Sequence, residues 1–240
     1  MELQRYAIKQ IKHLNAEVTR GCNLSCDYCF NSSGRKMPNE LDTKSWKRVL
    51  DISKQYGAKS SLFTGGEVML RKDSPEIIAY SLGNDLETSI LTNGFRLKEV
   101  GNGFIRNMKR IQISLDSASP YTHDSRRGNG SWKIAREAID FAREHSAAVE
   151  ISTTISQDRL DELEGIVGVA YATGSKVLVR PLQQIGRAKS GGNEDLNSHI
   201  VKKQEKLVKV FGNIFVEDFA KYVPVLGENH DNLVLPEGYI

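Results

Sequence analysis

Three cysteines lie within eight residues of one another, and the chain contains no others. Cys22, Cys26 and Cys29 form the pattern CxxxCxxC directly after a short segment that predicts a first strand. An odd number of clustered cysteines argues against a disulfide framework, whose cysteines are even in number and spread along the chain. Thiolates at this spacing can converge on one inorganic centre from a loop wrapped around it. The spacing therefore predicts a metal site.

The identity of the metal centre depends on its fourth ligand. A structural zinc site has four protein ligands in a closed tetrahedron. The chain has no fourth cysteine, and His13 lies nine residues upstream of Cys22, across the predicted strand. A cubic [4Fe–4S] cluster usually takes four thiolates, and with three of them one iron stays open to a ligand that is not protein. The residues favour a reactive iron–sulfur cluster, with a zinc site as the remaining alternative.

Further motifs follow the cysteines in a fixed order. Thr19 precedes the first cysteine and the aromatic Tyr28 precedes the last. The later stretches are Phe63-Thr64-Gly65-Gly66-Glu67, Leu91-Thr92-Asn93-Gly94, Ile113-Ser114-Leu115-Asp116, Arg127-Gly128-Asn129-Gly130-Ser131, and Arg180-Pro181-Leu182 with Gly186-Arg187-Ala188. This series resembles the radical S-adenosylmethionine superfamily over residues 15–190. The last two stretches resemble its SPASM-type branch, which includes many peptide-modifying maturases.

The resemblance implies a partial (β/α)6 barrel, TIM-like, with parallel strands, outer helices and a site at the carboxyl ends of the strands. It implies that Cys22, Cys26 and Cys29 are the catalytic cysteines and hold one [4Fe–4S] cluster. It also implies that the backbone of Tyr28 lies near the adenine of S-adenosylmethionine. We expect all of these motifs at one end of the barrel.

Other residues match the part of the family pattern that binds S-adenosylmethionine. Gly65, Gly66 and Glu67 match the segment that receives the methionine amino group, since glycines permit close approach and a carboxylate accepts from an ammonium. The remaining expected contacts are Ser114 and Asp116 with ribose or carboxylate, Arg127 with the cofactor carboxylate, and Thr92 and Asn93 as supports of the pocket. A turn is an equal explanation for Thr92 and Asn93, and a surface ion pair is an alternative for Arg127.

The implied chemistry begins when S-adenosylmethionine chelates the open iron through its amino and carboxylate groups. One electron, delivered by an external reductant of the flavodoxin or ferredoxin type, breaks the sulfur–C5′ bond and leaves a 5′-deoxyadenosyl radical. That radical abstracts hydrogen from a substrate, while the protein positions groups and excludes water. We expect a ribosomal peptide as substrate, as for a maturase. The alternatives are a small polar metabolite, such as a sugar or nucleoside, and a non-catalytic cluster-binding scaffold.

The chain departs from the family pattern in two places. Val68 follows Glu67 where the family often has proline. SPASM-type members carry further cysteines after the barrel for auxiliary clusters, and here no cysteine follows Cys29. We therefore expect one cluster, either in a lone radical core or in a chain truncated before an auxiliary region.

Short apolar runs alternate with helical patterns, which predicts βαβ units and a parallel sheet. The expected strands are Glu17–Thr19, Ser60–Thr64, Ser89–Asn93, Arg110–Asp116, Ala148–Ile155 and Lys176–Leu182. The expected helices are one capped by Asp42 or Thr43 and ended by Gly57, one carrying Ala135, Ala138, Ile139 and Ala142 on a face, and one from a capping Ser156 to Gly174. Periodicity does not separate a partial barrel from an open doubly wound sheet.

Two of the expected strands have a polar face. Gln112, Ser114 and Asp116 share one side of the fourth strand, and Glu150, Ser152 and Thr154 share one side of the fifth. A parallel sheet covered on both faces is apolar on both, so these residues face either solvent at an edge strand or a polar barrel lumen. Such a lumen would be a substrate chamber.

The bulk composition excludes several classes of protein. The 240 residues carry a net charge of only +3, with bases spread among acids, which argues against nucleic acid as a partner. No apolar run approaches the ~20 residues of a membrane span, and the N-terminus lacks the apolar core of a signal peptide. We expect a cytoplasmic protein without a membrane partner.

We expect three regions along the chain. Residues 1–14 form a lead-in, residues 15–190 the core barrel, and residues 191–240 a C-terminal helix and tail. Ser190-Gly191-Gly192-Asn193 predicts a flexible joint, Asp195–Val210 a charged helix, and residues 223–240 a tail.

Overall fold

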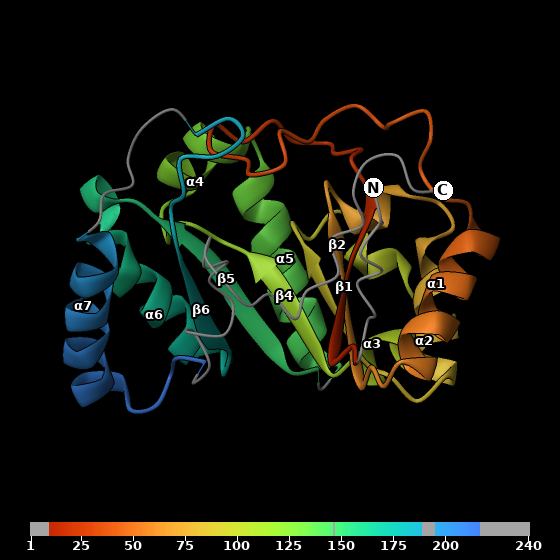
Figure 1. Cartoon of the computed structure of the whole chain (residues 1–240). Coiled ribbons are helices and arrows are strands. Elements are labelled where there is room, and N and C mark those ends of the chain that lie inside the picture. Colours follow the sequence, from red (N-terminus) through yellow and green to blue (C-terminus); the bar gives the residue numbers. More distant parts are fainter. Residues whose placement is uncertain (1–9, 146, 189–194, 217–240) are drawn as a thin grey trace, which may run out of the picture.

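The fold is a single sheet of six parallel strands in sequence order, β1-β2-β3-β4-β5-β6. The computed structural model describes residues 10–145, 147–188 and 195–216. The strands are β1 (His13–Thr19), β2 (Ser60–Gly65), β3 (Glu87–Thr92), β4 (Arg110–Ser114), β5 (Val149–Ile155) and β6 (Lys176–Pro181). They fan across the molecule and curve around a concave side (Figure 1). Within the described ranges no pairing joins β1 to β6, so the barrel is partial.

Helices connect the strands and line the outside of the curved sheet (Figure 1). They are α1 (Thr43–Gln55), α2 (Ser74–Gly83), α3 (Asn102–Arg106), α4 (Pro120–Arg127), α5 (Ser131–Glu144), α6 (Glu162–Thr173) and α7 (Leu196–Phe211), with short 3-10 turns at Val68–Leu70, Leu97–Glu99 and Gln157–Arg159. Right-handed crossovers that always advance in one direction place every helix on the same face of a sheet. The strand order therefore confirms the partial barrel over the doubly wound sheet, whose order reverses.

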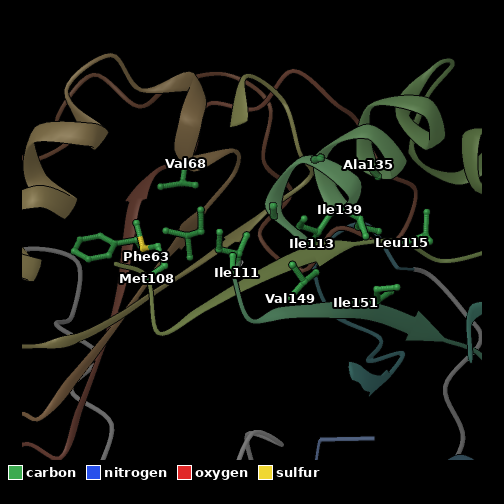
Figure 2. Packing of buried hydrophobic residues seen from close by; sticks show 14 of the residues in the cluster. Phe63, Val68, Met108, Ile111, Ile113, Leu115, Ala135, Ile139, Val149 and Ile151 are labelled. Carbon is green, nitrogen blue, oxygen red and sulfur yellow. The ribbon is translucent and has the colours of Figure 1, made fainter. Parts of the chain in front are cut away.

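The hydrophobic core fills the space between the sheet and the outer helices. Figure 2 shows side chains of β4 and β5, among them Ile113 and Ile151, facing Ala135 and Ile139 of α5. Ile113, Ile139 and Ile151 are completely buried. Burying an aliphatic side chain of this size stabilises the fold by about 1.5–3 kcal/mol. This outer apolar layer leaves the opposite face of each strand turned toward the concave side.

The expected elements are present, and their ends differ by a few residues. Asp42 is the N-cap of α1, where its carboxylate accepts from Ser45 N–H at 2.7 Å, and Gly57 has a left-handed φ of +97° beyond the helix. The expectation that Ser156 caps a continuous helix was wrong. Its hydroxyl bonds to Asp158, a 3-10 turn follows, and α6 begins only at Glu162.

The C-terminal part of the described chain packs on the barrel. Leu196, Ile200 and Leu207 of α7 are buried in the common core, and Lys203 Nζ lies 3.2 Å from a carboxylate oxygen of Asp161. Beyond α7, Phe215 forms a parallel bridge with β6. Strand β1 begins two residues inside the expected lead-in. The expected joint at 190–193 and the tail at 223–240 lie outside the described residues, and the three-region division stays a prediction. None of the helices in the described ranges has the length and apolarity needed to cross a membrane.

Candidate active site

The sequence motifs converge at the carboxyl ends of the strands. The cysteine loop (residues 20–34) follows β1, Gly65 ends β2 and Glu67 lies two residues beyond it. Asn93 follows β3, Asp116 follows β4, and Arg127 ends α4. In Figure 1 the loop after β1, helix α4 and the segment after β6 all lie at this end of the sheet. Strand order alone brings these separate parts of the chain together.

The cysteine loop presents three half-buried thiols. Backbone N–H groups point at two sulfurs, because Leu24 N lies 3.4 Å from Cys22 Sγ and Ser33 N lies 3.4 Å from Cys29 Sγ. Burial raises the pKa of Cys22 to about 11, and the neighbouring Glu67 carboxylate and other thiols add to the rise. Burial likewise raises the pKa of Cys26. These thiols are therefore neutral by themselves and need a cationic centre to ionise.

The surroundings of the three cysteines bear on which inorganic centre they could hold. Among the described side chains, no three His, Cys, Asp or Glu converge closely enough to hold one metal ion. N–H groups donating to sulfur are the second-shell contacts that adjust iron–sulfur centres. Three thiols with such N–H donors are a ligand set that an iron–sulfur cluster can take, and the choice between a cluster and zinc stays a prediction.

Gly65 and Gly66, at the end of β2, lie against the backbone that leads from β1 into the cysteine loop. A Cβ on Gly65, whose φ is +136°, would lie 2.3 Å from the carbonyl oxygen of Thr19, and one on Gly66 would lie 2.3 Å from that of Gly21. Gly66 N–H donates to the Thr19 carbonyl at 2.7 Å, and Glu67 N–H donates to the Gly21 carbonyl at 2.8 Å. The absence of side chains thus lets the end of β2 fasten the start of the cysteine loop. An additional contact with a cofactor amino group stays a prediction.

Glu67 is completely buried and ties the ends of β2 and β3 together. Its carboxylate accepts from Thr92 Oγ1 at 2.7 Å, from Asn93 N–H at 2.7 Å and from Met69 N–H at 3.0 Å. Burial raises its pKa to about 7, although these three donors lower it. Three donors leave one of about four acceptor positions on the carboxylate, so in this structure Glu67 chiefly orients the strand ends.

Thr92 and Asn93 serve both the turn and the site. Gly94 N–H donates to Thr92 Oγ1 at 3.0 Å and Phe95 N–H to Asn93 Oδ1 at 2.9 Å, which closes the turn after β3. Asn93 Nδ2 also donates to Asn23 Oδ1 in the cysteine loop at 3.0 Å. Sequence reasoning did not identify Asn23, although its place directly after the first cysteine was a usable signal.

Asp116, Arg127 and Tyr28 form a buried charged cluster. Arg127 Nε donates to Asp116 Oδ2 at 2.6 Å, Thr154 N–H donates to Oδ1 at 3.0 Å, and the Tyr28 hydroxyl donates to Oδ2. Burial alone would raise the pKa of Asp116, but the adjacent Arg127 and these donors lower it to about 2. Burial raises the pKa of Tyr28 well above its usual range, so the phenol is neutral. Asp116 thus orients both the tyrosine beside Cys29 and the arginine expected to meet the cofactor carboxylate.

Two further residues of α4 belong to this cluster and were not identified from the sequence. The Arg126 guanidinium lies 4.1 Å from the centre of the Tyr28 ring. His123 is buried, and its Nδ1 accepts from Asp116 N–H at 3.1 Å, while Nε2 has no partner among the described atoms. Burial lowers the pKa of His123 to about 4, with the charge of Arg127 in support. Residues 123, 126 and 127 share one helical face, and that spacing was the available signal.

The concave face of β4, β5 and β6 carries a polar network. Gln112 Nε2 donates to Glu150 Oε2 at 2.9 Å, and Arg180 donates to Gln112 Oε1 at 3.1 Å and to Ser152 Oγ at 3.0 Å. Both β4 and β5 lie inside the sheet, so the edge-strand explanation of their polar faces was wrong. Ser114 pairs in register with Ser152 at the same end of this face. The network makes the lumen polar directly below the cysteine end.

Comparisons with known proteins agree with this geometry. The sequence profile of the Radical SAM superfamily matches residues 16–163. The mycofactocin maturase MftC of Mycobacterium tuberculosis (strain ATCC 25618 / H37Rv) is 31% identical over 177 residues, which cover 72% of this chain and 45% of the relative. An AdoMet-dependent heme synthase of Oleidesulfovibrio alaskensis is 32% identical over 163 residues, covering 66% of this chain and 42% of the relative. The chain spans less than half the length of these relatives.

The fold also has counterparts among solved structures. Streptococcus suis SuiB bound to S-adenosylmethionine superposes with a TM-score of 0.77 at 18% identity, over 87% of this chain and 50% of SuiB. SuiB has also been solved with a precursor peptide, SuiA. The profile match covers more than half of the chain and includes the cysteine loop, the Gly-Gly-Glu segment and the Asp116–Arg127 pair. The chain belongs to the Radical SAM superfamily.

Proposed function

We propose that this protein is a radical S-adenosylmethionine enzyme that carries a single [4Fe–4S] cluster on Cys22, Cys26 and Cys29. The observation that carries the proposal is the three-thiol loop fastened to the polar strand ends. A cluster held by these cysteines would supply one electron to bound S-adenosylmethionine, which would give methionine and a 5′-deoxyadenosyl radical able to abstract hydrogen from the substrate. A reduced flavodoxin or ferredoxin supplies the electron.

The chain's own residues bind and orient the cofactor in this proposal. Gly65 and Gly66 expose backbone groups for the methionine amino group, with Glu67, Thr92 and Asn93 as the buried support behind them. Polar side chains at the strand ends, Ser114 among them, line the approach to the ribose. Beside the cysteine loop, the Arg126 guanidinium lies 4.1 Å from the centre of the Tyr28 ring, and the Tyr28 hydroxyl donates to Asp116.

In this proposal Arg127 can donate to two carboxylates, that of Asp116 and that of S-adenosylmethionine. In the structure it is paired with Asp116 through Nε and Nη2 at 2.6 and 3.3 Å. A guanidinium has five N–H donors, so it can keep Asp116 and still donate to the carboxylate of S-adenosylmethionine. We propose that Asp116 holds it in readiness for that contact.

The substrate we propose is a ribosomal peptide. The sequence likeness to a maturase and the fold likeness to SuiB support this choice, and the polar lumen suits a peptide backbone, whose amides need hydrogen-bond partners. A small polar metabolite is the second candidate, because the heme synthase relative matches at comparable identity. A short open reading frame for a precursor peptide beside the gene would favour the peptide.

The test is anaerobic reconstitution with iron and sulfide, followed by reduction with dithionite in the presence of S-adenosylmethionine. We expect reductant-dependent 5′-deoxyadenosine, and a Cys26→Ala variant should form none. Adding the substrate peptide with deuterium at its reactive carbon should transfer deuterium to 5′-deoxyadenosine. Iron uptake and S-adenosylmethionine binding without any cleavage would refute the enzyme and leave a cluster-binding scaffold.

A further inference from the structure

The segment after β6 lies directly on the cysteine loop. Arg187 Nε donates to the Cys26 carbonyl at 2.7 Å, and its Nη1 donates to the Ser33 carbonyl at 2.7 Å. Its backbone N–H donates to the Cys29 carbonyl at 3.0 Å. Three donors of one residue thus hold three carbonyls of the loop, from a position more than 150 residues later in the chain. Neither the implied cluster ligands nor the expected S-adenosylmethionine contacts include this residue.

The residue before Arg187 permits this close contact. Gly186 has φ +68°, and a Cβ there would lie 2.2 Å from the carbonyl oxygen of Phe30 and 2.3 Å from that of Cys29. No other residue type fits without displacing the loop backbone. We call residues 186–187 the strap. At Gly186 the strap backbone lies directly against the backbone of the cysteine loop.

The chemistry of the strap suits a loop that wraps an iron–sulfur cluster. The N–H groups of Leu24 and Ser33 face sulfur, while the carbonyls of Cys26, Cys29 and Ser33 accept from Arg187. The guanidinium fork reaches two carbonyls at once, which the single ammonium of a lysine cannot do in the same geometry. Its positive charge close to the loop also favours the more negative, reduced state of a cluster held there.

We propose that Arg187 is a positioning residue that fixes Cys26 and Cys29 in their ligating conformation and so sets how firmly the cluster is held and how easily it is reduced. The inference rests on the proposed [4Fe–4S] site and adds a determinant outside the three thiols. Among the described contacts, those of Arg187 with the cysteine loop are all with backbone carbonyls, so it acts through the loop backbone.

The test compares anaerobically reconstituted wild type with Arg187→Gln and Arg187→Lys. The readouts are the rate at which a ferrous chelator bleaches the cluster absorbance, and the midpoint potential from an optical redox titration. Loss of outer-shell partners typically weakens metal binding by about 10- to 100-fold, so we expect Arg187→Gln to bleach faster by a factor in that range and to have a more negative midpoint. Arg187→Lys keeps the charge, so its midpoint should stay near wild type while its cluster still bleaches faster.

Arg143 provides a matched control. Its side chain also donates to two backbone carbonyls, those of Thr173 at 2.9 Å and Ala147 at 3.0 Å, but it lies at the end of α5, away from the cysteine loop. Arg143→Gln removes the same kind of contact and should leave the bleaching rate and midpoint at wild-type values. Equal effects of Arg143→Gln and Arg187→Gln would overturn the proposal, because they would show a general weakening of the fold.

A second pair of variants tests the strap without removing the guanidinium. Gly186→Ala places a methyl group against the loop carbonyls, whereas Gly130→Ala introduces an alanine in the left-handed region, at φ +80°, with nothing within 4 Å of its Cβ. We expect rapid bleaching for Gly186→Ala alone. The thermal unfolding of each cluster-free variant reports whether it is folded.

The outcomes separate this inference from the proposed function. A wild type that takes up no iron overturns both. A stable cluster in wild type and in Arg187→Gln alike overturns the role of Arg187 and leaves the proposed function standing. A cluster that depends on Arg187 in a protein that never cleaves S-adenosylmethionine supports the strap while refuting the enzyme.

Discussion

The buried pair of Asp116 and Arg127 offers the sharpest test of the site's electrostatics. Their side chains are only 1% and 9% exposed. The pKa of Asp116 is about 2 against an ordinary 3.8, which corresponds to about 2 kcal/mol of net stabilisation of the ionised carboxylate. Without Arg127 the same burial would raise that pKa. Removing one partner of a buried pair typically costs about 3–5 kcal/mol because the other charge is left uncompensated.

We therefore expect Arg127→Met to lower the free energy of unfolding at pH 7 by about 3–5 kcal/mol. Asp116→Asn removes the carboxylate charge, so the double variant should be less destabilised than the sum of the two single variants by at least about 2 kcal/mol. Urea unfolding of cluster-free wild type, both single variants and the double variant measures this coupling.

The pH dependence supplies an independent check of the same pair. In wild type the folded pKa of Asp116 is depressed, so its stabilising contribution is present above pH 3.8 and is lost as the pH falls toward 2. In Arg127→Met the pH dependence of the Asp116 contribution has the opposite sign. A carboxyl group whose folded pKa is raised makes the protein less stable as the pH rises. The loss of unfolding free energy in Arg127→Met, relative to wild type, should therefore be smaller at pH 5 than at pH 7. A cost below about 1 kcal/mol with additive effects would refute the reasoning.

Three further predictions follow from the described geometry. The folded pKa of Glu67 is about 7 against an ordinary 4.5. The free energy of unfolding of wild type should therefore fall by up to about 3 kcal/mol relative to Glu67→Gln as the pH rises from 4.5 through 7. The measurement is the difference between the two pH profiles of unfolding free energy. The folded pKa of His123 is about 4 against 6.5, so its contribution has the opposite sign: wild type should lose up to about 3 kcal/mol relative to His123→Gln as the pH falls from 6.5 through 4, and flat difference profiles would contradict both. Gly66→Ala should abolish iron uptake because its Cβ would lie 2.3 Å from the Gly21 carbonyl, whereas Gly34→Ala, with nothing within 4 Å of its Cβ, should reconstitute normally; similar iron content in the two variants would show that the close approach is not needed.

Much of the fold followed from local patterns. The strands and the expected helices α1, α5 and α7 lie within a few residues of their expected positions, because apolar periodicity reports which face of an element is buried. Helices α2, α3 and α4 were not expected. The start of α6 was missed because a serine before a helical pattern is a good cap in general, while here Asp158 takes its hydroxyl. Local preference cannot anticipate a competing partner two residues away that becomes available only in the folded turn.

The sequence by itself predicted the chemistry of the site. Three thiols within eight residues are close whatever the rest of the chain does, because a short loop limits how far its residues can separate. The missing fourth ligand, and the order of the later motifs, needed no coordinates either. These features indicated an open iron–sulfur centre and the family.

Only the tertiary structure decided how that site is held. A Cβ on Gly66 would lie 2.3 Å from the Gly21 carbonyl oxygen, so only glycine fits there. The Glu67 carboxylate accepts from Asn93 N–H. Arg187 donates to the carbonyl of Cys26, 161 positions earlier in the sequence. The polar face of β4 became a lumen only because further strands flank it on both sides. Contacts of this kind depend on how the curved sheet brings distant strand ends together, and local pattern carries no record of that approach.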